Sequence, residues 1–114
     1  MCGIFAITVS DQANIKKQDL ISIIDELFRL SESRGKEASG LAISTNGRIE
    51  IYKDAISASD MIRRRSYREW LTQILSNGQN NGMSNPIAII GHSRLVTNGS
   101  METHDNNQQL LQMI

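Results

Sequence analysis

The sequence has little of what marks several classes of protein. Only one cysteine, Cys2, occurs in 114 residues, so no internal disulfide can form and the signature of a small secreted domain is missing. Twelve lysines and arginines balance twelve aspartates and glutamates, and a formal net charge of zero creates no long-range attraction to nucleic acid or anionic membrane. We therefore expect a cytoplasmic location and no general affinity for polyanions.

Long hydrophobic runs are also lacking. The apolar start of the chain soon reaches Ser10, Asp11 and Gln12, and it carries no basic leader. It is too short for the apolar core of a signal peptide or for a membrane span. At 114 residues the chain has the length of one domain with one hydrophobic core. We expect a single domain over residues 1–114 and no membrane partner.

Two continuous apolar runs predict buried strands. Residues 4–9 and 87–90 are rich in β-branched side chains, a composition typical of strands covered on both faces. The second of these strands is predicted to end at Gly91 and His92. Strands of this kind form the interior of a layered fold.

A hairpin and two helices are predicted between these strands. Residues 40–44 and 48–53 flank the pair Asn46-Gly47, which is the strongest short hairpin signal because both turn residues must accept positive φ. Apolar spacing and polar composition predict two helices and a loop, at about residues 20–33, 59–75 and 76–85. Together these elements predict an α+β fold in which sheets pack together with helices outside them.

Cys2 carries the chemistry that the sequence predicts. Removal of Met1, favoured when the next residue is small, leaves a thiol and a free α-amine on one residue. The amine titrates at about 7.7–8 and the thiol near about 8.5, so the amine can accept the thiol proton near neutral pH. Gly3 would let a substrate approach the backbone closely. Taken alone, however, such a cysteine is more often a small apolar residue near a strand end.

Three segments occur in an order typical of one enzyme family. They are Cys2-Gly3-Ile4-Phe5, Arg34-Gly35-Lys36-Glu37-Ala38-Ser39-Gly40 and Gly91-His92-Ser93-Arg94-Leu95-Val96-Thr97-Asn98-Gly99. Together they resemble the class II, N-terminal-nucleophile (Ntn) glutamine amidotransferases, most closely the branch containing glucosamine-6-phosphate synthase and amidophosphoribosyltransferase. The resemblance extends to about Gln109. It implies an Ntn-hydrolase-like four-layer αββα sandwich, of which this chain would be an incomplete N-terminal portion.

The resemblance also implies a role for each matching residue. Cys2 would form a γ-glutamyl thioester, and Arg94 would pair with the α-carboxylate of glutamine, which a guanidinium fork matches bidentately. Thr97 and Asn98 match positions that bind the substrate or order the loop around it. The supporting positions are Arg34 for the loop of the nucleophile, His92 for the loop carrying Arg94, and Gly35, Gly40 and Gly99 for unusual backbone angles or close approach.

The chain departs from the family pattern in three places. Ala38-Ser39 reverses the common Ser-Ala order, and Gln109 replaces a proline. The sequence stops at Ile114, before the family's Asn-Gly oxyanion pair and the acidic residue that binds the α-amine of glutamine. Loss of one oxyanion donor typically costs about 10²–10³ in rate. We expect these residues alone to be inactive, or nearly so, and to belong to a longer polypeptide.

The resulting hypothesis is an enzyme that catalyses a glutaminase half-reaction. Glutamine is hydrolysed to glutamate and ammonia, and a synthase domain or partner subunit transfers the ammonia to an acceptor, with amino-sugar biosynthesis as one pathway. No cofactor is expected, and no metal, because His92 and His104 have no cysteine near them. The acceptor, the removal of Met1 and the oligomeric state, including a homo-oligomer, stay open.

Two alternatives stand beside this hypothesis. The first is a catalytically silent glutamine-binding or regulatory module of the same fold. The second is a phosphate- or nucleic-acid-binding domain that uses the basic run on the second predicted helix, Arg63, Arg64, Arg65 and Arg68. Such a run is more often a solvated helix face, so binding to nucleic acid is not expected.

Overall fold

The computed structural model describes residues 2–10, 15–79 and 86–95, and every element below lies in these ranges. Its strands are β1 (Gly3–Val9), β2 (Ala38–Thr45), β3 (Arg48–Asp54) and β4 (Ile87–Arg94). Its helices are α1 (Lys17–Ser31), the 3₁₀ helix η1 (Glu32–Arg34), α2 (Ala58–Met61) and α3 (Arg65–Gln79). This mixture of one sheet and several helices agrees with the predicted α+β class.

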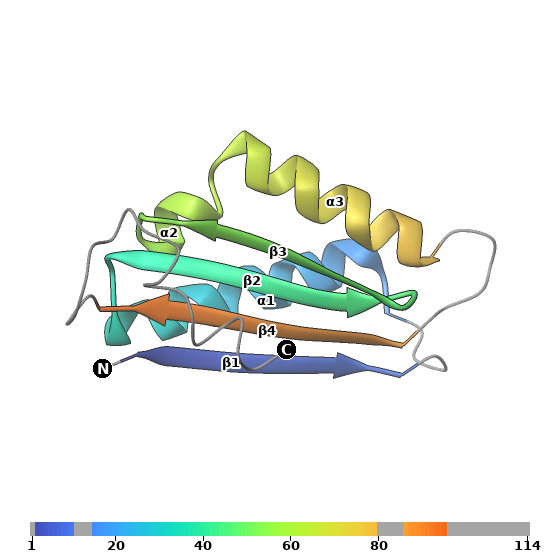
Figure 1. The fold of residues 1–114 in the computed structure, drawn as a ribbon, viewed down its shortest axis with the longest axis horizontal. Coiled ribbons are helices and arrows are strands. Elements are labelled where there is room, and N and C mark those ends of the chain that lie inside the picture. Colours follow the sequence, from blue (N-terminus) through green and yellow to red (C-terminus); the bar gives the residue numbers. More distant parts are fainter. Residues whose placement is uncertain (1, 11–14, 80–85, 96–114) are drawn as a thin grey trace.

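The four strands form one antiparallel sheet in the order β1-β4-β2-β3 (Figure 1). The last strand in the described sequence, β4, therefore lies between β1 and β2. Gly3 pairs with Ser93 at one side of β4, and Ala38 pairs with Arg94 at the other. The start of β1, the start of β2 and the end of β4 consequently meet at one end of the sheet, on the left in Figure 1.

The predicted hairpin is confirmed. β2 and β3 pair from Thr45 and Arg48 outward, with only two residues between them. Asn46 and Gly47 have φ values of 55° and 72°. Positive φ at both turn residues matches the right-handed twist of the flanking strands, which is why Asn-Gly is suited to this position.

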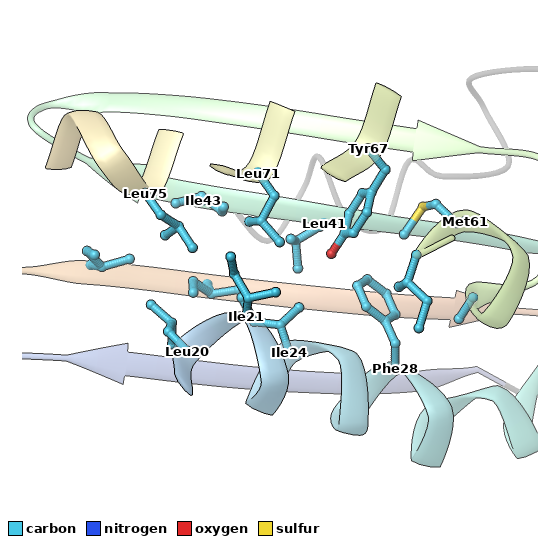
Figure 2. Close-up of a cluster of buried hydrophobic side chains, with 14 residues drawn as sticks. Leu20, Ile21, Ile24, Phe28, Leu41, Ile43, Met61, Tyr67, Leu71 and Leu75 are labelled. Atoms are coloured by element: carbon cyan, nitrogen blue, oxygen red, sulfur yellow. The ribbon is translucent and has the colours of Figure 1, made fainter. Parts of the chain in front are cut away.

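The hydrophobic core lies between one face of the sheet and the helices (Figure 2). Each fully buried leucine or isoleucine side chain contributes about 1.5–3 kcal/mol to folding. Phe28 of α1 meets Phe5 of β1 edge to face, with ring centroids 4.9 Å apart. The residues at the centre of the core are Leu20, Ile24, Phe28, Leu41, Ile43, Tyr67, Leu71, Leu75 and Ile89.

The opposite face of the sheet is exposed along β1, so the described part of the chain does not provide the predicted cover on both faces of this strand. Side chains alternate between faces along a strand. Ala6 and Thr8 are exposed and Ile4 is 50% exposed, whereas the alternate residues pack toward the core. The physical reason is that, in the described part of the chain, helices cover only one face of the sheet. Ile49 on β3 is likewise 49% exposed.

Three predicted boundaries also require correction. The second predicted helix is two helices, because the step from the buried Ile62 to the buried Tyr67 is five residues and does not fit a single helical face. α3 then continues to Gln79, into the predicted loop. β4 continues to Arg94, beyond the predicted end at Gly91 and His92, because it pairs with β2 that far. The end of the first helix near residue 33 is confirmed, since η1 extends α1 to Arg34.

Candidate functional site

The proposed nucleophile lies at the end of the sheet where the three motifs meet. The register of β1 with β4 includes Gly3 opposite Ser93. Cys2 comes one residue before Gly3, and Arg94, the last residue of β4, comes one residue after Ser93. Cys2 and Arg94 therefore lie at the same end of the sheet, each directly beside this cross-strand pair. Both residues are partly exposed, so a small molecule has access to them.

A hollow of about 400 Å³ opens beside Cys2. This volume falls within the range of small-molecule sites, which is about 300–1,000 Å³. Arg34 lies on the same hollow, and its supporting role for the loop of the nucleophile stays a prediction. The walls come from β1 and from the end of α1, and include Cys2, Phe5, Leu27, Leu30, Ser31 and Arg34.

Gly35 is required by a close approach and not by an unusual backbone angle. Its φ is 179°, which any residue can adopt. A Cβ at Gly35 would overlap the backbone of Arg94 and Leu95. The next contact along the chain has the same partner, since the amide N–H of Glu37 donates to the carbonyl oxygen of Arg94 at 3.1 Å. The second motif therefore packs directly against the backbone that carries Arg94.

A pair of buried serines was not predicted from the sequence. The hydroxyls of Ser31, at the end of α1, and Ser93, in β4, lie 2.7 Å apart. Ser31 also donates to the carbonyl oxygen of Phe28 at 3.0 Å. A Cβ built at Gly3 would lie 2.5 Å from the carbonyl oxygen of Ser31, so only glycine fits there. Nothing in the apolar spacing of α1 distinguishes Ser31, because its importance depends on strands that are distant in sequence.

His92 lies inside β4 and not in a loop. It is 1% exposed and occupies the face of the sheet opposite the helices, between Ile4 of β1 and Gly40 of β2. It is two residues before Arg94 on the same strand. Arg94 is therefore carried by a strand and not by a loop, and the contribution of His92 to its position stays a prediction.

The reversed Ala38-Ser39 pair has a structural consequence. Ser39 is fully buried on the helix side of the sheet, and its hydroxyl donates to the carbonyl oxygen of Ile56 at 2.9 Å. It also lies 3.3 Å from the sulfur of Met61. The hydroxyl therefore anchors the segment that leads into α2.

The residues outside the described ranges include three to which the resemblance assigns a role, Thr97, Asn98 and Gly99. Gln109, where the chain departs from the family pattern, and His104 also lie outside these ranges. The roles of Thr97, Asn98 and Gly99 stay predictions.

Most arginines of the basic run, which covers the start of α3 and the residues just before it, pair with acidic side chains. Arg68 makes a bidentate pair with the buried Asp25 of α1, at 2.8 and 3.3 Å. Arg64 lies 3.5 Å from Asp54, and Arg65 lies 3.1 Å from Glu69. Three of the four arginines thus have internal counter-charges, which weakens the case for a phosphate-binding surface.

Within residues 2–10, 15–79 and 86–95, histidine, cysteine and acidic side chains form no group of three suited to a metal ion. None of the helices in the described part of the chain combines the length and apolar composition needed to cross a bilayer.

Comparison of the sequence with protein-family models gives no match, and comparison with curated proteins gives none that is significant. The family resemblance therefore rests on the three motifs.

Proposed function

We propose that this chain is the N-terminal part of a class II glutamine amidotransferase domain, acting in the cytoplasm. The observation that carries the proposal is the placement of Cys2 and Arg94 at the end of adjoining strands, given by the pair Gly3 and Ser93. The two residues belong to motifs about ninety residues apart in the sequence. A glutaminase needs a nucleophile and a group that binds the α-carboxylate of glutamine, and the proposal assigns these roles to Cys2 and Arg94.

The proposed reaction proceeds through a covalent intermediate. With Met1 removed, the α-amine of Cys2 accepts the thiol proton, and the thiolate attacks the side-chain amide carbon of glutamine. The ammonium group that forms then protonates the departing nitrogen, so ammonia leaves and a γ-glutamyl thioester remains. Water, deprotonated by the same amine, attacks the thioester and releases glutamate and the free thiol. Arg94 holds the α-carboxylate throughout.

The four-layer αββα sandwich is part of the proposal. Helices cover one face of the sheet in the described part of the chain. The opposite face carries Ile4 and Ile49, each about half exposed. A second sheet packed on this face would bury these side chains and complete a four-layer fold. The ammonia would pass to a synthase domain or subunit, with amino-sugar biosynthesis as one acceptor pathway.

Covalent labelling tests the proposal. The intact protein, with its N-terminal residue verified by mass, is incubated with an electrophilic glutamine analogue and mapped by peptide mass. We expect a single label on Cys2, protection by glutamine, and no label in Cys2→Ala. Absence of label on Cys2 in protein that lacks Met1 would reject the proposal.

Replacement of Arg94 tests its assignment separately. Arg94→Lys keeps the charge but loses the bidentate fork, so a higher glutamine concentration should be needed for protection, with the site of labelling unchanged. Arg48→Lys is the matched control, because Arg48 is exposed and begins β3 at the opposite end of the sheet. Equal protection curves for the two variants would remove Arg94 from the substrate site.

A further inference from the structure

We infer that Ser31 is a positioning residue for the proposed site: its hydroxyl ties β4 to α1 and so sets the place of Arg94 relative to Cys2. This inference rests on the proposed function. Ser31 lies at the last position of α1, immediately before η1. It contacts the residues that directly precede Arg94 and directly follow Cys2 in the sequence, through two different atoms.

The first contact is the hydrogen bond with Ser93. The two hydroxyl oxygens lie 2.7 Å apart, and both residues are buried. Ser31 uses its single hydroxyl proton for the carbonyl oxygen of Phe28 at 3.0 Å. Ser93 must therefore donate in the bond between the serines, and Ser31 accepts. The end of β4 is thereby joined to the end of a helix that packs in the core.

The second contact is made by the backbone of Ser31. Its carbonyl oxygen lies against Gly3, where an added Cβ would be only 2.5 Å away. The start of β1 therefore rests directly on the end of α1. Because the carbonyl belongs to the backbone, this contact survives replacement of the Ser31 side chain. The hydroxyl positions Arg94, whereas the carbonyl positions Cys2.

These two contacts predict an asymmetric result when the hydroxyls are removed. Ser31→Ala leaves the Ser93 donor buried without an acceptor, and a buried unsatisfied group is costly. Ser93→Ala leaves Ser31 with its bond to Phe28. Both variants lose the connection to β4, so both should misplace Arg94, but Ser31→Ala should lower the melting temperature more.

Steady-state kinetics of the intact protein, with Met1 removed, tests the inference. Ser31→Ala and Ser93→Ala should each raise the glutamine KM by about three- to tenfold, the equivalent of the net contribution of one hydrogen bond. The double variant should show the same rise as either single variant, because one connection is lost in all three. Ser93→Thr, which keeps the donor, should restore a KM near that of the parent protein.

Alkylation of Cys2 by iodoacetamide supplies a measurement that does not depend on glutamine binding. We expect the same alkylation rate in all variants, because the backbone contact of Ser31 with Gly3 is retained. Ser66→Ala is the matched control: it removes another hydroxyl pair of 2.7 Å, between Tyr52 and Ser66. Tyr52 lies on the edge strand β3, which β2 separates from β4. The KM of Ser66→Ala should not change.

The outcomes separate this inference from the function on which it rests. If the parent protein hydrolyses glutamine and both serine variants keep its KM, the positioning role is wrong and the proposed function stands. Additive KM changes in the double variant would also overturn the positioning role, as would an equal rise in Ser66→Ala. If the parent protein lacking Met1 does not hydrolyse glutamine, the proposed function is rejected and this inference with it.

Discussion

Single residues around the proposed site owe their identity to contacts that span the sequence. The motif spacing predicted that Gly35 is needed, but the reason, its contact with the backbone of Arg94 and Leu95, appears only when β4 lies beside the start of β2. Gly91 is similar, because a Cβ there would overlap the ring of Phe5. The sequence motifs could indicate that such glycines are needed, but not which residues they contact in the fold.

Tyr67 is the core residue whose burial costs the most evident free energy of folding, because a polar hydroxyl is buried with its ring. Its side chain is fully buried between Phe28, Tyr52 and Trp70, with ring centroids 5.5–6.3 Å from its own. Within the described residues its hydroxyl has no hydrogen-bond partner. Burial, and then the nearby Asp25 carboxylate, raise the pKa of Tyr67 well above its usual range.

Tyr67→Phe should therefore stabilise the protein. Removal of an unsatisfied buried hydroxyl should raise the free energy of unfolding by about 1 kcal/mol while keeping the ring contacts. Folding raises this pKa, so protonated Tyr67 does not reduce the stability of the parent protein below the unfolded pKa of about 10. As the pH rises above that value, the free energy of unfolding of the parent protein falls relative to that of Tyr67→Phe. Urea denaturation at pH 7 and above pH 10 measures both effects. A loss of stability in Tyr67→Phe at pH 7 would show that the hydroxyl has a partner.

At the scale of elements, short helices are joined by polar contacts that periodicity cannot reveal. Ser57 caps α2, since its hydroxyl accepts the N–H of Asp60 at 3.3 Å. Glu32 adds a second cap from η1: its carboxylate accepts the Ser59 hydroxyl at 2.6 Å and the Ser59 N–H at 3.2 Å. This contact links the segment before Gly35 to α2, and it spans 27 residues in sequence.

The carboxylate of Glu32 should make stability depend on pH. The Ser59 hydroxyl is the main cause that lowers the pKa of Glu32, with further help from the Ser59 N–H, Ser57 and Lys36 against the opposing effect of burial. Because folding lowers this pKa, the stabilisation is present above the unfolded value of about 4.3 and is lost as the pH falls through the folded value.

Urea midpoints between pH 3 and pH 7 test this contribution. Glu32→Gln should be less stable than the parent protein at pH 7, and the difference should shrink toward pH 3. Ser59→Ala, which removes the main donor to Glu32, should likewise weaken the dependence of stability on pH between pH 3 and pH 7. An undiminished difference at pH 3 would assign the effect to packing and not to charge.

The ion pair between Asp25 and Arg68 illustrates the same limit of sequence reasoning. The two residues are 43 positions apart and join α1 to α3. In the sequence, Arg68 belongs to a basic run, and such a run is most often the solvated face of a helix. That explanation is closer to the structure than a phosphate-binding surface, but the identity of the partner required the packing of the two helices.

At the scale of the whole molecule, the sequence predicted the kinds of elements better than their arrangement in layers. Local patterns gave the hairpin at Asn46-Gly47 and the end of the first helix. The insertion of β4 between β1 and β2 is a non-local pairing that no local pattern encodes. The continuous apolar run of β1 predicted cover on both faces, whereas the described part of the chain provides helices on one.

Hydrolysis of glutamine by the intact protein, measured together with the mass of its N-terminus, tests the central claim most directly. A variant with one bulky residue inserted between Met1 and Cys2 retains Met1 and has no free α-amine on Cys2. The account predicts that protein beginning at Cys2 hydrolyses glutamine and that the Met1-retaining form does not. Equal hydrolysis by the form that retains Met1 would contradict it.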